Sequence, residues 1–478
     1  MKSFRKTKII GTIGPASDNE ETLRELMLAG LNCARINFSH GGYEENEAKI
    51  NLIKRLREEL GLPIALALDT KGPEIRTGKF VGGQKQELHE GDTFTFVKEE
   101  IEGDNTKTTI SFGDLYKNVQ PGNTILVDDG KIEFEVTAVE GTNIVTKVVN
   151  GGELGQRKTV NVPGVEIDLP ALSEKDTKDI TDGIKAGFDY IFASFVRRPD
   201  DVLQIRKLLD DNGGENVEII SKIESMEGIS NFDEILKLSN GIMVARGDLG
   251  VEIPLEQVPV VQKKMIRKCN DAGKPVIIAT QMLESMQENQ RPTRAEVSDV
   301  ANAVYDLTSC IMLSGEVAQG KYPVECVKDM DKIAVSCESS LHYWSRFSAK
   351  DYRHSKSNFK AISAYASCII AKEVAADGIL SYTHTGVSLN YISSLRPGCP
   401  IVAVTDDKKT FYKLGLVQNV YPVFIEPKSS INETIETGIK MLEKEGIFET
   451  GDIITICSGS KILPMEKDSY TVGGVIKI

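Results

Sequence analysis

The order of apolar and polar positions changes twice along the chain and predicts three kinds of segment. Up to Thr70, short apolar runs alternate with amphipathic stretches. KIIGTIG precedes a helical pattern that ends near Gly30, NCARINFSH precedes a long helix that ends near Gly61, and PIALALDT follows. Short apolar strands that alternate with helices predict βαβ units and a parallel sheet.

The apolar period becomes two after Thr70. From about Gly72 to Asp168 apolar and polar residues alternate, as in TILVDDGKIEFEVTAVEGTNIVTKVVN, and turn signals such as Gly82-Gly83 and Pro121-Gly122 recur. This pattern is typical of short strands joined by tight turns. We therefore interpret residues 72–168 as an inserted all-β domain.

The strand–helix alternation resumes at Leu172. The apolar runs FDYIFAS, EIISKIE, GIMVARG, PVIIATQ and CIMLSGE are each followed by a helical segment. With the three earlier strands they make eight strand–helix units interrupted by one insertion. This arrangement predicts an α/β fold, a (β/α)8 TIM barrel formed by residues 1–71 and 169–345, whose active site lies at the C-terminal strand ends. On pattern alone, a doubly wound sheet of eight strands is the alternative.

A third unit is predicted after the barrel. The polar stretch SRFSAKDYRHSK indicates a linker near Ser345–Lys356. Beyond it, the strand-like runs GILSYTHTG, IVAVTDD, YPVFIE and DIITICSG alternate with helical patterns. We expect a C-terminal α/β domain over residues 356–478.

Composition narrows the classes of partner. The net charge of −13 argues against general binding of polyanions, so we expect no nucleic-acid partner, although a local basic cleft could hold phosphates. No apolar run reaches the roughly 18–20 residues of a membrane span. The N-terminal MKSFRKTKIIGTIG turns glycine-rich where a signal peptide would be apolar, and the eight cysteines form no CxxC pair. We expect a cytoplasmic protein with reduced, buried cysteines.

Polar residues follow the predicted barrel strands directly, at the ends where an active site would lie. A single charged strand end is weak support for a site, because strand ends are usually solvated. Repetition at several strands is harder to assign to chance. The segments are Arg35-Ile36-Asn37-Phe38-Ser39-His40, Asp69-Thr70-Lys71, Lys222-Ile223-Glu224, Arg246-Gly247-Asp248 and Thr280-Gln281.

Lys222 and Glu224 lie two residues apart, which places both side chains on one face of a strand. Inside a barrel, either charge alone would carry a large desolvation penalty, and a bound metal with an anionic substrate would compensate for that penalty. Glu224 and Asp248 come from neighbouring strands, and two carboxylates completed by water and substrate oxygens are a usual Mg²⁺ arrangement. The alternative is a structural ion-pair network of Lys222, Glu224 and Asp248.

The turn Gly247–Gly250 has two interpretations. A glycine-rich turn that opens a helix exposes backbone N–H groups that suit a carboxylate or phosphate. The alternative is an ordinary tight loop.

Taken together, these segments resemble the pyruvate kinase family. The likeness spans nearly the whole predicted barrel, flanks the insertion as the family's β-barrel lid domain requires, and extends more weakly over the C-terminal domain. The matching stretches are KIIGTIGPAS, ARINFSHG, ALDTKGPEIRTG, LPALSEKD, SKIESMEG, IMVARGDLGVE, ATQMLESM, RPTRAEVSDVANAV and CIMLSGE.

The resemblance implies a glycolytic phosphoryl transfer between phosphoenolpyruvate and ADP, giving pyruvate and ATP. It implies Mg²⁺ or Mn²⁺ at Glu224 and Asp248, and Lys222 and Arg35 at the transferring phosphoryl group. It implies a seat for the substrate carboxylate on the backbone of Gly247 and Asp248, with Thr280 near the proton delivered to the enolate. The implied K⁺ site comprises Asn37, Ser39, Asp69 and Thr70, and the implied nucleotide contacts are Asn37, His40, Arg76 and Lys158.

Two further expectations rest on the family. Members with glutamate at the position of Glu74 depend on K⁺, whereas those with lysine do not, so we expect K⁺ activation here. The family's usual homotetramer is expected by resemblance only.

Two regions depart from the family pattern or match it weakly. Relatives usually carry Asp-Gly-Ala-Asp where this chain has Asp306-Leu307-Thr308-Ser309, a change that we interpret as altered packing or an altered subunit contact. A C-terminal loop resembles the family's effector loop and would take a sugar phosphate or a nucleotide. However, Asn390 stands where an arginine is often found, and the final loop lacks the usual glycine-rich stretch. The candidate effector residues are Thr383, Thr385, Gly386 and Ser388.

Two rival functions stay open at this stage. A metal-dependent aldolase or lyase acting on pyruvate-type substrates could share a barrel and a Glu/Asp metal pair, but would not need the inserted domain or the monovalent-cation residues. A non-catalytic relative that serves as a binding or regulatory protein is the second rival.

Overall fold

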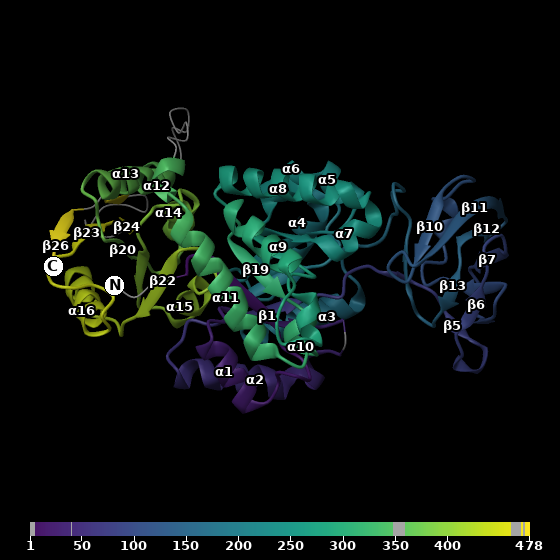
Figure 1. Ribbon diagram of the computed structural model, residues 1–478, viewed down its shortest axis with the longest axis horizontal. Coiled ribbons are helices and arrows are strands. Elements are labelled where there is room, and N and C mark those ends of the chain that lie inside the picture. Colours follow the sequence, from purple (N-terminus) through teal and green to yellow (C-terminus); the bar gives the residue numbers. More distant parts are fainter. Residues whose placement is uncertain (1–4, 40, 348–358, 460–469, 472–473) are drawn as a thin grey trace.

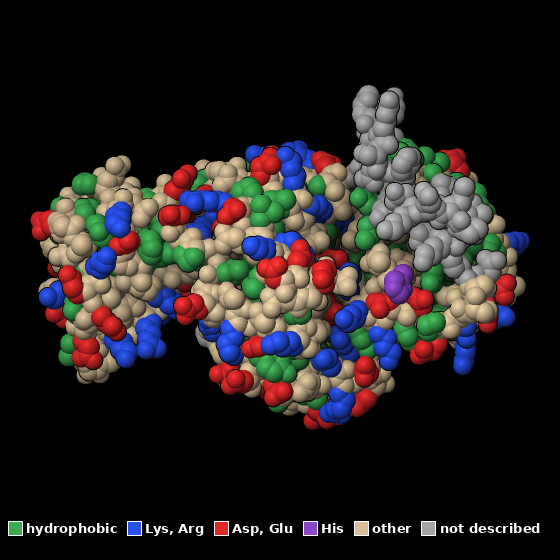
Figure 2. Space-filling model, turned by 180° about the vertical axis from the view of Figure 1, so that it is seen from behind, with side chains coloured by type: hydrophobic (Ala, Val, Ile, Leu, Met, Phe, Trp, Pro, Cys, Tyr) green, Lys and Arg blue, Asp and Glu red, His purple; other side chains and the backbone are tan. Residues whose placement is uncertain are grey.

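A computed structural model describes residues 5–39, 41–347, 359–459, 470–471 and 474–478. Three units follow one another along its longest axis (Figure 1). A central barrel lies between an all-β domain at one end and an α/β domain at the other. On the face shown in Figure 2, acidic and basic side chains are intermixed over the barrel. No helix in the described part of the chain is long and apolar enough to cross a membrane.

The central unit is a closed barrel of eight parallel strands, so the predicted TIM barrel is confirmed and a doubly wound sheet is excluded. Neighbours in the barrel follow the order of the chain, and the first and last strands close it. The strands are β1 (Lys8–Thr12), β2 (Cys33–Asn37), β3 (Ala65–Asp69), β15 (Tyr190–Ala193), β16 (Glu218–Ile223), β17 (Gly241–Ala245), β18 (Val276–Ala279) and β19 (Cys310–Leu313).

Helices surround the barrel, and local sequence sets where they begin and end. The Asn19 side chain caps the first helix, and Gly30 beyond its end has φ +112°, as its predicted position after the helix requires. Ser173 and Thr293 form capping boxes at two others. The helices are α1 (Glu20–Leu28), α2 (Tyr43–Glu59), α3 (Glu174–Ala186), α4 (Pro199–Asp211), α5 (Met226–Ser230), α6 (Phe232–Leu238), α7 (Arg246–Glu252), α8 (Val258–Ala272), α9 (Arg294–Tyr305), α10 (Gly315–Ala318) and α11 (Pro323–Ser340). The short α12 (Tyr343–Arg346) follows at the junction with the C-terminal domain, where Trp344 packs against that domain's core.

Side-chain alternation along the strands positions the site. Residues two apart share a strand face, so the inward positions below the site are apolar and those at the C-terminal ends are polar. On β16, for example, Ile220 belongs to the inner cluster and is followed at the same parity by Lys222 and Glu224. The inner cluster is Ile10, Cys33, Ala65, Ala67, Tyr190, Phe192, Ile220, Met243, Ile277, Ala279, Cys310, Met312 and Leu416.

The inserted domain is all-β, with its own core around Phe94, Phe96 and Phe134. Its main sheet has seven strands. Thr77 and Ile110, which directly follow the two edge strands of this sheet, pair with each other in an isolated β-bridge. The main sheet, in order, is β4 (Ile75–Arg76), β14 (Thr159–Asn161), β10 (Thr124–Val127), β11 (Ile132–Glu140), β12 (Asn143–Asn150), β7 (Thr93–Val97) and β9 (Lys107–Thr109). Two short pairs accompany it: β5 (Lys79–Phe80) with β8 (Glu102–Gly103), and β6 (Gln86–Leu88) with β13 (Gly152–Leu154).

The C-terminal unit is an α/β domain whose four predicted strands are confirmed, with an additional antiparallel edge strand. It packs against the N-terminal end of the barrel, where Leu416 joins the inner cluster and Lys8 Nζ donates to the Val420 carbonyl at 2.7 Å. The sheet order is β22 (Val420–Phe424), β21 (Ile401–Thr405), β20 (Gly378–Tyr382), β23 (Ile453–Ile456) and β26 (Val475–Lys477). The helices are α13 (Phe359–Glu373), α14 (Val387–Ser394), α15 (Lys408–Leu414) and α16 (Ile431–Lys444), and β24 (Ser458–Gly459) pairs with β25 (Tyr470–Thr471).

Candidate active site

Four charged side chains meet inside the C-terminal end of the barrel. Lys222 Nζ lies 3.0 Å from Glu224 Oε1 and 3.3 Å from Asp69 Oδ1. Arg35 donates from Nε to the other carboxylate oxygen of Asp69, and from Nη1 to Thr12 Oγ1 at 2.6 Å. All four charged residues are buried, so two cations and two carboxylates balance one another out of water.

The surroundings shift the pKa values of this network in opposite directions. Burial alone would lower the pKa of Lys222, but the carboxylates of Asp69 and Glu224 outweigh it and hold the pKa above its usual value. Burial acts to raise the pKa of Asp69, but the charges of Arg35 and Lys222 hold it below its usual value. Burial raises the pKa of Glu224 to about 7, even though Lys222 acts against this shift. Glu224 is therefore the carboxylate with the least compensation.

The ion-pair alternative is realised in part. Lys222 pairs with Glu224, as that interpretation requires, but its other partner is Asp69. The carboxylate of Asp248 accepts no hydrogen bond from the described residues and lines an open cleft. Asp248 is thus available for a ligand that the ion-pair interpretation does not include.

Glu224 and Asp248 have the chemistry of a divalent-cation site. The Phe195 N–H donates to Glu224 Oε2 at 2.6 Å, whereas Oε1 is buried and, although near Lys222, has no hydrogen bond of acceptable geometry. Within the described residues no group of three or more His, Cys, Asp or Glu could hold a metal. An ion here would have these two carboxylates and would take its other oxygens from water and substrate, as Mg²⁺ commonly does. The residues therefore fit such an ion.

Ser194 is a member of the cluster that the strand-end reasoning missed. Its Oγ lies 2.8 Å from Lys222 Nζ, 3.1 Å from Asp69 Oδ1 and 2.6 Å from the Thr70 carbonyl oxygen. It follows Tyr190 and Phe192 at the inward parity of β15. That parity was the available signal. However, a small, neutral serine after the apolar run FDYIFA does not indicate a functional site in the way that a charged residue does.

Gly247 and Thr280 are brought together at the first turn of α7. The Gly247 N–H donates to Thr280 Oγ1 at 2.8 Å. Thr280 has φ +71° and Gln281 has φ +54°, a left-handed conformation that side chains disfavour. Arg246 holds this segment, because its Nη2 donates to the Thr280 carbonyl at 2.6 Å while Nη1 pairs with Asp299 at 2.7 Å. The Thr280 hydroxyl is therefore fixed at the first turn of α7 by a backbone segment in a left-handed conformation.

The residues expected to bind K⁺ lie at the adjacent ends of β2 and β3. Asn37 and Asp69 are partners in the strand register, and Ser39 donates its N–H to Asn37 Oδ1 at 3.0 Å. Thr70 is buried next to Asp69 and accepts the Ser194 N–H at Oγ1. The side chains supply only neutral or anionic oxygens, which suits a hard monovalent cation. His40 lies outside the described residues.

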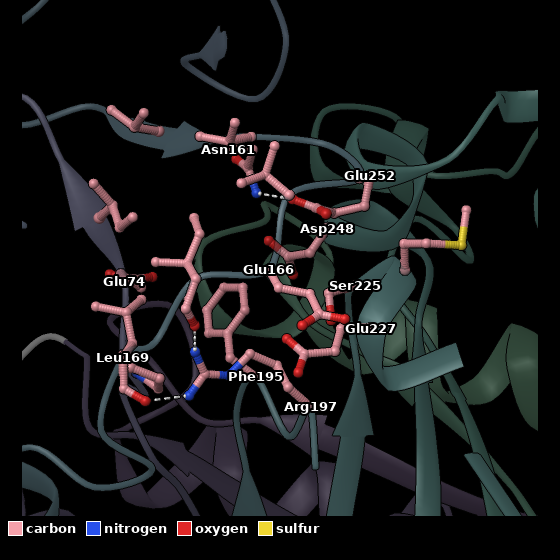
Figure 3. A pocket seen from close by; sticks show the side chains of 18 of the residues that line it. Glu74, Asn161, Glu166, Leu169, Phe195, Arg197, Ser225, Glu227, Asp248 and Glu252 are labelled. Atoms are coloured by element: carbon pink, nitrogen blue, oxygen red, sulfur yellow. Dashed lines mark hydrogen bonds between the residues drawn. The ribbon is translucent and has the colours of Figure 1, made fainter. Parts of the chain in front are cut away.

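A cleft of about 310 Å³ separates the strand ends from the inserted domain (Figure 3). Asp248 and Glu252 of α7 line it beside Glu74 and Asn161 of the other side, and Asn161 Nδ2 donates to Glu252 Oε1 at 2.9 Å. Of the expected nucleotide contacts, Arg76 and Lys158 lie elsewhere on the inserted domain and Asn37 lies on β2, and none of these three lines the cleft. Arg76 pairs with Glu74, and Lys158 pairs with Asp128, each at 2.8 Å.

The candidate effector loop lies in the C-terminal domain, on the opposite side of the barrel from the inserted domain (Figure 1). Thr383 Oγ1 accepts the Gly386 N–H at 2.9 Å, and Gly386, with φ +82°, precedes α14. Thr385 is exposed, whereas Ser388 is buried. His384 Nδ1 lies 2.9 Å from Asp406 Oδ1, so an acidic side chain accompanies the loop.

Comparison with known proteins identifies the family. The family model described as "Pyruvate kinase, barrel domain" matches residues 4–327, and "Pyruvate kinase, alpha/beta domain" matches residues 361–470. The pyruvate kinase of Clostridium acetobutylicum is 48% identical over 457 residues, which cover 95% of this chain and 96% of the relative. That of Bacillus licheniformis is 49% identical over 460 residues, covering 96% of this chain and 78% of the relative.

A solved structure agrees with these sequence matches. The crystal structure of a pyruvate kinase from Cryptosporidium parvum superposes with a TM-score of 0.94 at 37% identity, covering 99% of this chain and 96% of that one. The likeness therefore includes all three units and the strand ends that carry the charged cluster. On these grounds the chain belongs to the pyruvate kinase family and is a phosphotransferase.

Proposed function

We propose that the chain transfers the phosphoryl group of phosphoenolpyruvate to ADP in glycolysis, giving pyruvate and ATP, with Mg²⁺ (or Mn²⁺) and K⁺ as cofactors. The observation that carries the proposal is the buried network of Arg35, Asp69, Lys222 and Glu224, which adjoins a cleft at the C-terminal end of the barrel. Two cations held in a site of low dielectric constant are suited to a substrate whose phosphoryl group carries several negative oxygens.

Glu224 and Asp248 would hold the divalent ion. The bound ion would supply positive charge to the oxygens of the phosphoryl group. The partly uncompensated charge of Glu224 Oε1 and the free carboxylate of Asp248 support this assignment.

Lys222 and Arg35 would bind the phosphoryl group by exchanging partners. In the structure, their charges are neutralised by Asp69 and Glu224. An incoming phosphate offers new oxygen partners to the same two cations. Because Lys222 and Arg35 are already held in place, the protein does not have to order these side chains during the reaction. Phosphoryl transfer leaves little covalent work for the protein, and such positioning and charge neutralisation account for most of its contribution.

Gly247 and Thr280 would serve the other end of the substrate. The backbone of Gly247 and Asp248 would take the carboxylate. The Thr280 hydroxyl, which accepts the Gly247 N–H, would lie near the proton that is delivered to the enolate.

Asn37, Ser39, Asp69 and Thr70 would hold K⁺, which adds one positive charge beside the phosphoryl group. Arg76 and Lys158 would contact the nucleotide, together with Asn37 and His40. The Arg76 side chain would then leave Glu74, and the Lys158 side chain would leave Asp128, to bind the phosphates of ADP. This exchange requires the inserted domain to act as a lid.

Regulation and assembly follow the family in this proposal. The loop containing Thr383, Thr385, Gly386 and Ser388 would bind a sugar-phosphate or nucleotide effector. The protein would be a cytoplasmic homotetramer.

A lactate-dehydrogenase-coupled assay with phosphoenolpyruvate and ADP tests the proposal. We expect NADH oxidation that requires ADP, a divalent ion and K⁺. An aldolase or lyase would turn over its substrate without ADP, and a non-catalytic relative would show no activity. Either result would refute the proposal. A panel of sugar phosphates and AMP in the same assay tests the effector loop.

A further inference from the structure

Arg396 is a buried cation at the junction between the C-terminal domain and the N-terminal end of the barrel. The residue is 5% exposed and has φ +52°. Its Nη2 donates to Asn270 Oδ1 at 2.8 Å, to the Leu307 carbonyl at 2.9 Å and to Ser309 Oγ at 3.1 Å. All three acceptors are neutral, so none of them balances the charge of the guanidinium.

Arg396 differs in this respect from the other buried arginines of the described chain. Arg35 pairs with Asp69, Arg57 lies 3.2 Å from Asp189, and Arg197 lies 3.8 Å from Asp201. No described carboxylate is within ion-pair distance of Arg396, and its Nε and Nη1 are buried without a hydrogen-bond partner.

An unpaired buried charge is unfavourable. Burial lowers the pKa of Arg396 to about 10, which reflects the same imbalance.

Ser309, within the departure at residues 306–309, lies next to Arg396 and provides a hydroxyl instead of a counter-ion. The family pattern has aspartate where this chain has Ser309, whose hydroxyl lies beside Arg396. The same pattern has glycine at Leu307, which has φ +67°. The backbone thus keeps the conformation that suits glycine, while the carboxylate that would have faced the guanidinium is absent.

A cleft of about 390 Å³ adjoins this place and is rich in cations. Lys263, Arg267 and Arg346 line it together with Arg396, and the carboxylates of Asp271 and Asp306 also line it. Lys263 is neutralised by Asp306, and Arg346 donates to the Tyr305 carbonyl, but no partner of the exposed Arg267 is recorded within the described residues. The cleft has the size of a small-ligand site. It offers one exposed and one buried guanidinium, neither of which forms an ion pair with a described carboxylate.

We propose that this cleft binds a phosphate-bearing small molecule whose oxyanion supplies the counter-charge of Arg396, with Arg267 as the outer contact. Guanidinium groups bind phosphate through paired, charge-assisted hydrogen bonds. Because Nε and Nη1 are shielded from solvent, binding requires the guanidinium to turn toward the cleft. The site is separate from the active site and from the loop at Thr383–Ser388, and it does not depend on the proposed catalytic roles.

Substitutions at Ser309 test the proposal, because they change the charge next to Arg396 in opposite ways. Inorganic phosphate is titrated calorimetrically into the metal-free full chain at constant ionic strength. Ser309→Asp supplies the missing carboxylate, and Ser309→Asn is the neutral control of equal size. We expect Ser309→Asp to raise the melting temperature without phosphate and to weaken phosphate binding about tenfold or more. Ser309→Asn should keep the phosphate affinity of the unaltered protein.

Arg267→Met provides a second variant, because this side chain is exposed and its replacement does not disturb the core. We expect it to weaken phosphate binding a few-fold while the melting temperature without phosphate stays the same. Phosphate bound at other sites contributes equally to every variant. Equal affinity in the unaltered protein, Ser309→Asp and Arg267→Met would overturn the proposal. So would a loss of binding in Ser309→Asn as large as in Ser309→Asp, or no measurable binding to the unaltered protein, as when water alone fills the space.

Discussion

Lys222 Nζ lies 3.3 Å from Asp69 Oδ1, although the two residues belong to strands β16 and β3, which are separated in the barrel by β15. The contact crosses the barrel interior over Ser194, the polar residue at the end of the intervening strand. Asp69 thus acts as an internal anion for two cations that, in the proposed reaction, bind the phosphoryl group.

Ser194→Ala tests whether this arrangement positions Lys222. Removing the hydroxyl leaves Lys222 without one of its three partners, so we expect kcat to fall about 10-fold to 100-fold, as for other groups that orient active-site side chains. The coupled assay measures the change. Ser194→Thr, which keeps the hydroxyl, should recover most of the rate. Ser221→Ala, which removes a buried hydroxyl paired with Ser239, should leave kcat close to that of the unaltered protein. Equal rates for Ser194→Ala and the unaltered protein would contradict a positioning role.

Glu74→Lys tests the K⁺ assignment. Glu74 lines the cleft and pairs with Arg76, and a fixed ammonium at this place would replace the charge of the monovalent ion. We expect the unaltered protein to be strongly activated by K⁺ and the variant to be nearly independent of it. Initial rates are compared in K⁺ and in a bulky organic cation at equal ionic strength. If the unaltered protein reacts equally fast in both salts, the K⁺ site is wrong.

Lys8→Met tests the burial of a lysine between the barrel and the C-terminal domain. Burial, assisted by the charge of Arg5, lowers the pKa of Lys8 to about 7. An unfolded lysine has a pKa of about 10.4, so between these values the unfolded chain binds more protons and stability rises with pH.

We expect the stability of the unaltered protein relative to Lys8→Met to increase between about pH 6.5 and pH 9, with a slope of up to about 1.4 kcal/mol per pH unit. Melting temperatures of the two proteins across this range measure it. Exposed Lys207→Met is the control and should show no such trend. A difference between the unaltered protein and Lys8→Met that does not change with pH would contradict the account.

Leu307→Gly and Leu307→Ala separate backbone strain from packing. Leu307 has φ +67° and is packed against the barrel core, so both variants lose apolar contacts, but only glycine also relieves the backbone. We expect the glycine variant to be more stable than the alanine variant by about 1 kcal/mol, measured by urea denaturation side by side. An alanine variant as stable as the glycine variant would show that the left-handed conformation carries no cost here.

Repeating patterns made the architecture predictable. Eight apolar runs, each followed by a helical pattern, identified every barrel strand, because strands buried on both faces are recognisable as continuous apolar segments. The change to period two located the inserted domain. Charged strand ends such as Lys222 and Asp69 stood out because they interrupt those segments.

Features that depend on contacts between residues far apart in the sequence could not be predicted. Ser194 is ordinary in composition, and its role depends on three neighbours from other strands. Arg396 resembles any loop arginine, and only the fold reveals that it is buried without a carboxylate. The substitution at Ser309 was visible in the sequence as a departure from the family, but its consequence was not, because Arg396 lies 87 residues away.

The activity of Lys222→Met in the coupled assay with phosphoenolpyruvate and ADP is the sharpest test of the proposed phosphoryl transfer. Methionine keeps the length and apolar stem of the lysine but removes the charge that would stabilise the transferring phosphoryl group. We predict a folded protein, as judged by circular dichroism, whose kcat is lower than that of the unaltered protein by about 10²-fold to 10³-fold or more. A variant that turns over at the full rate would contradict it.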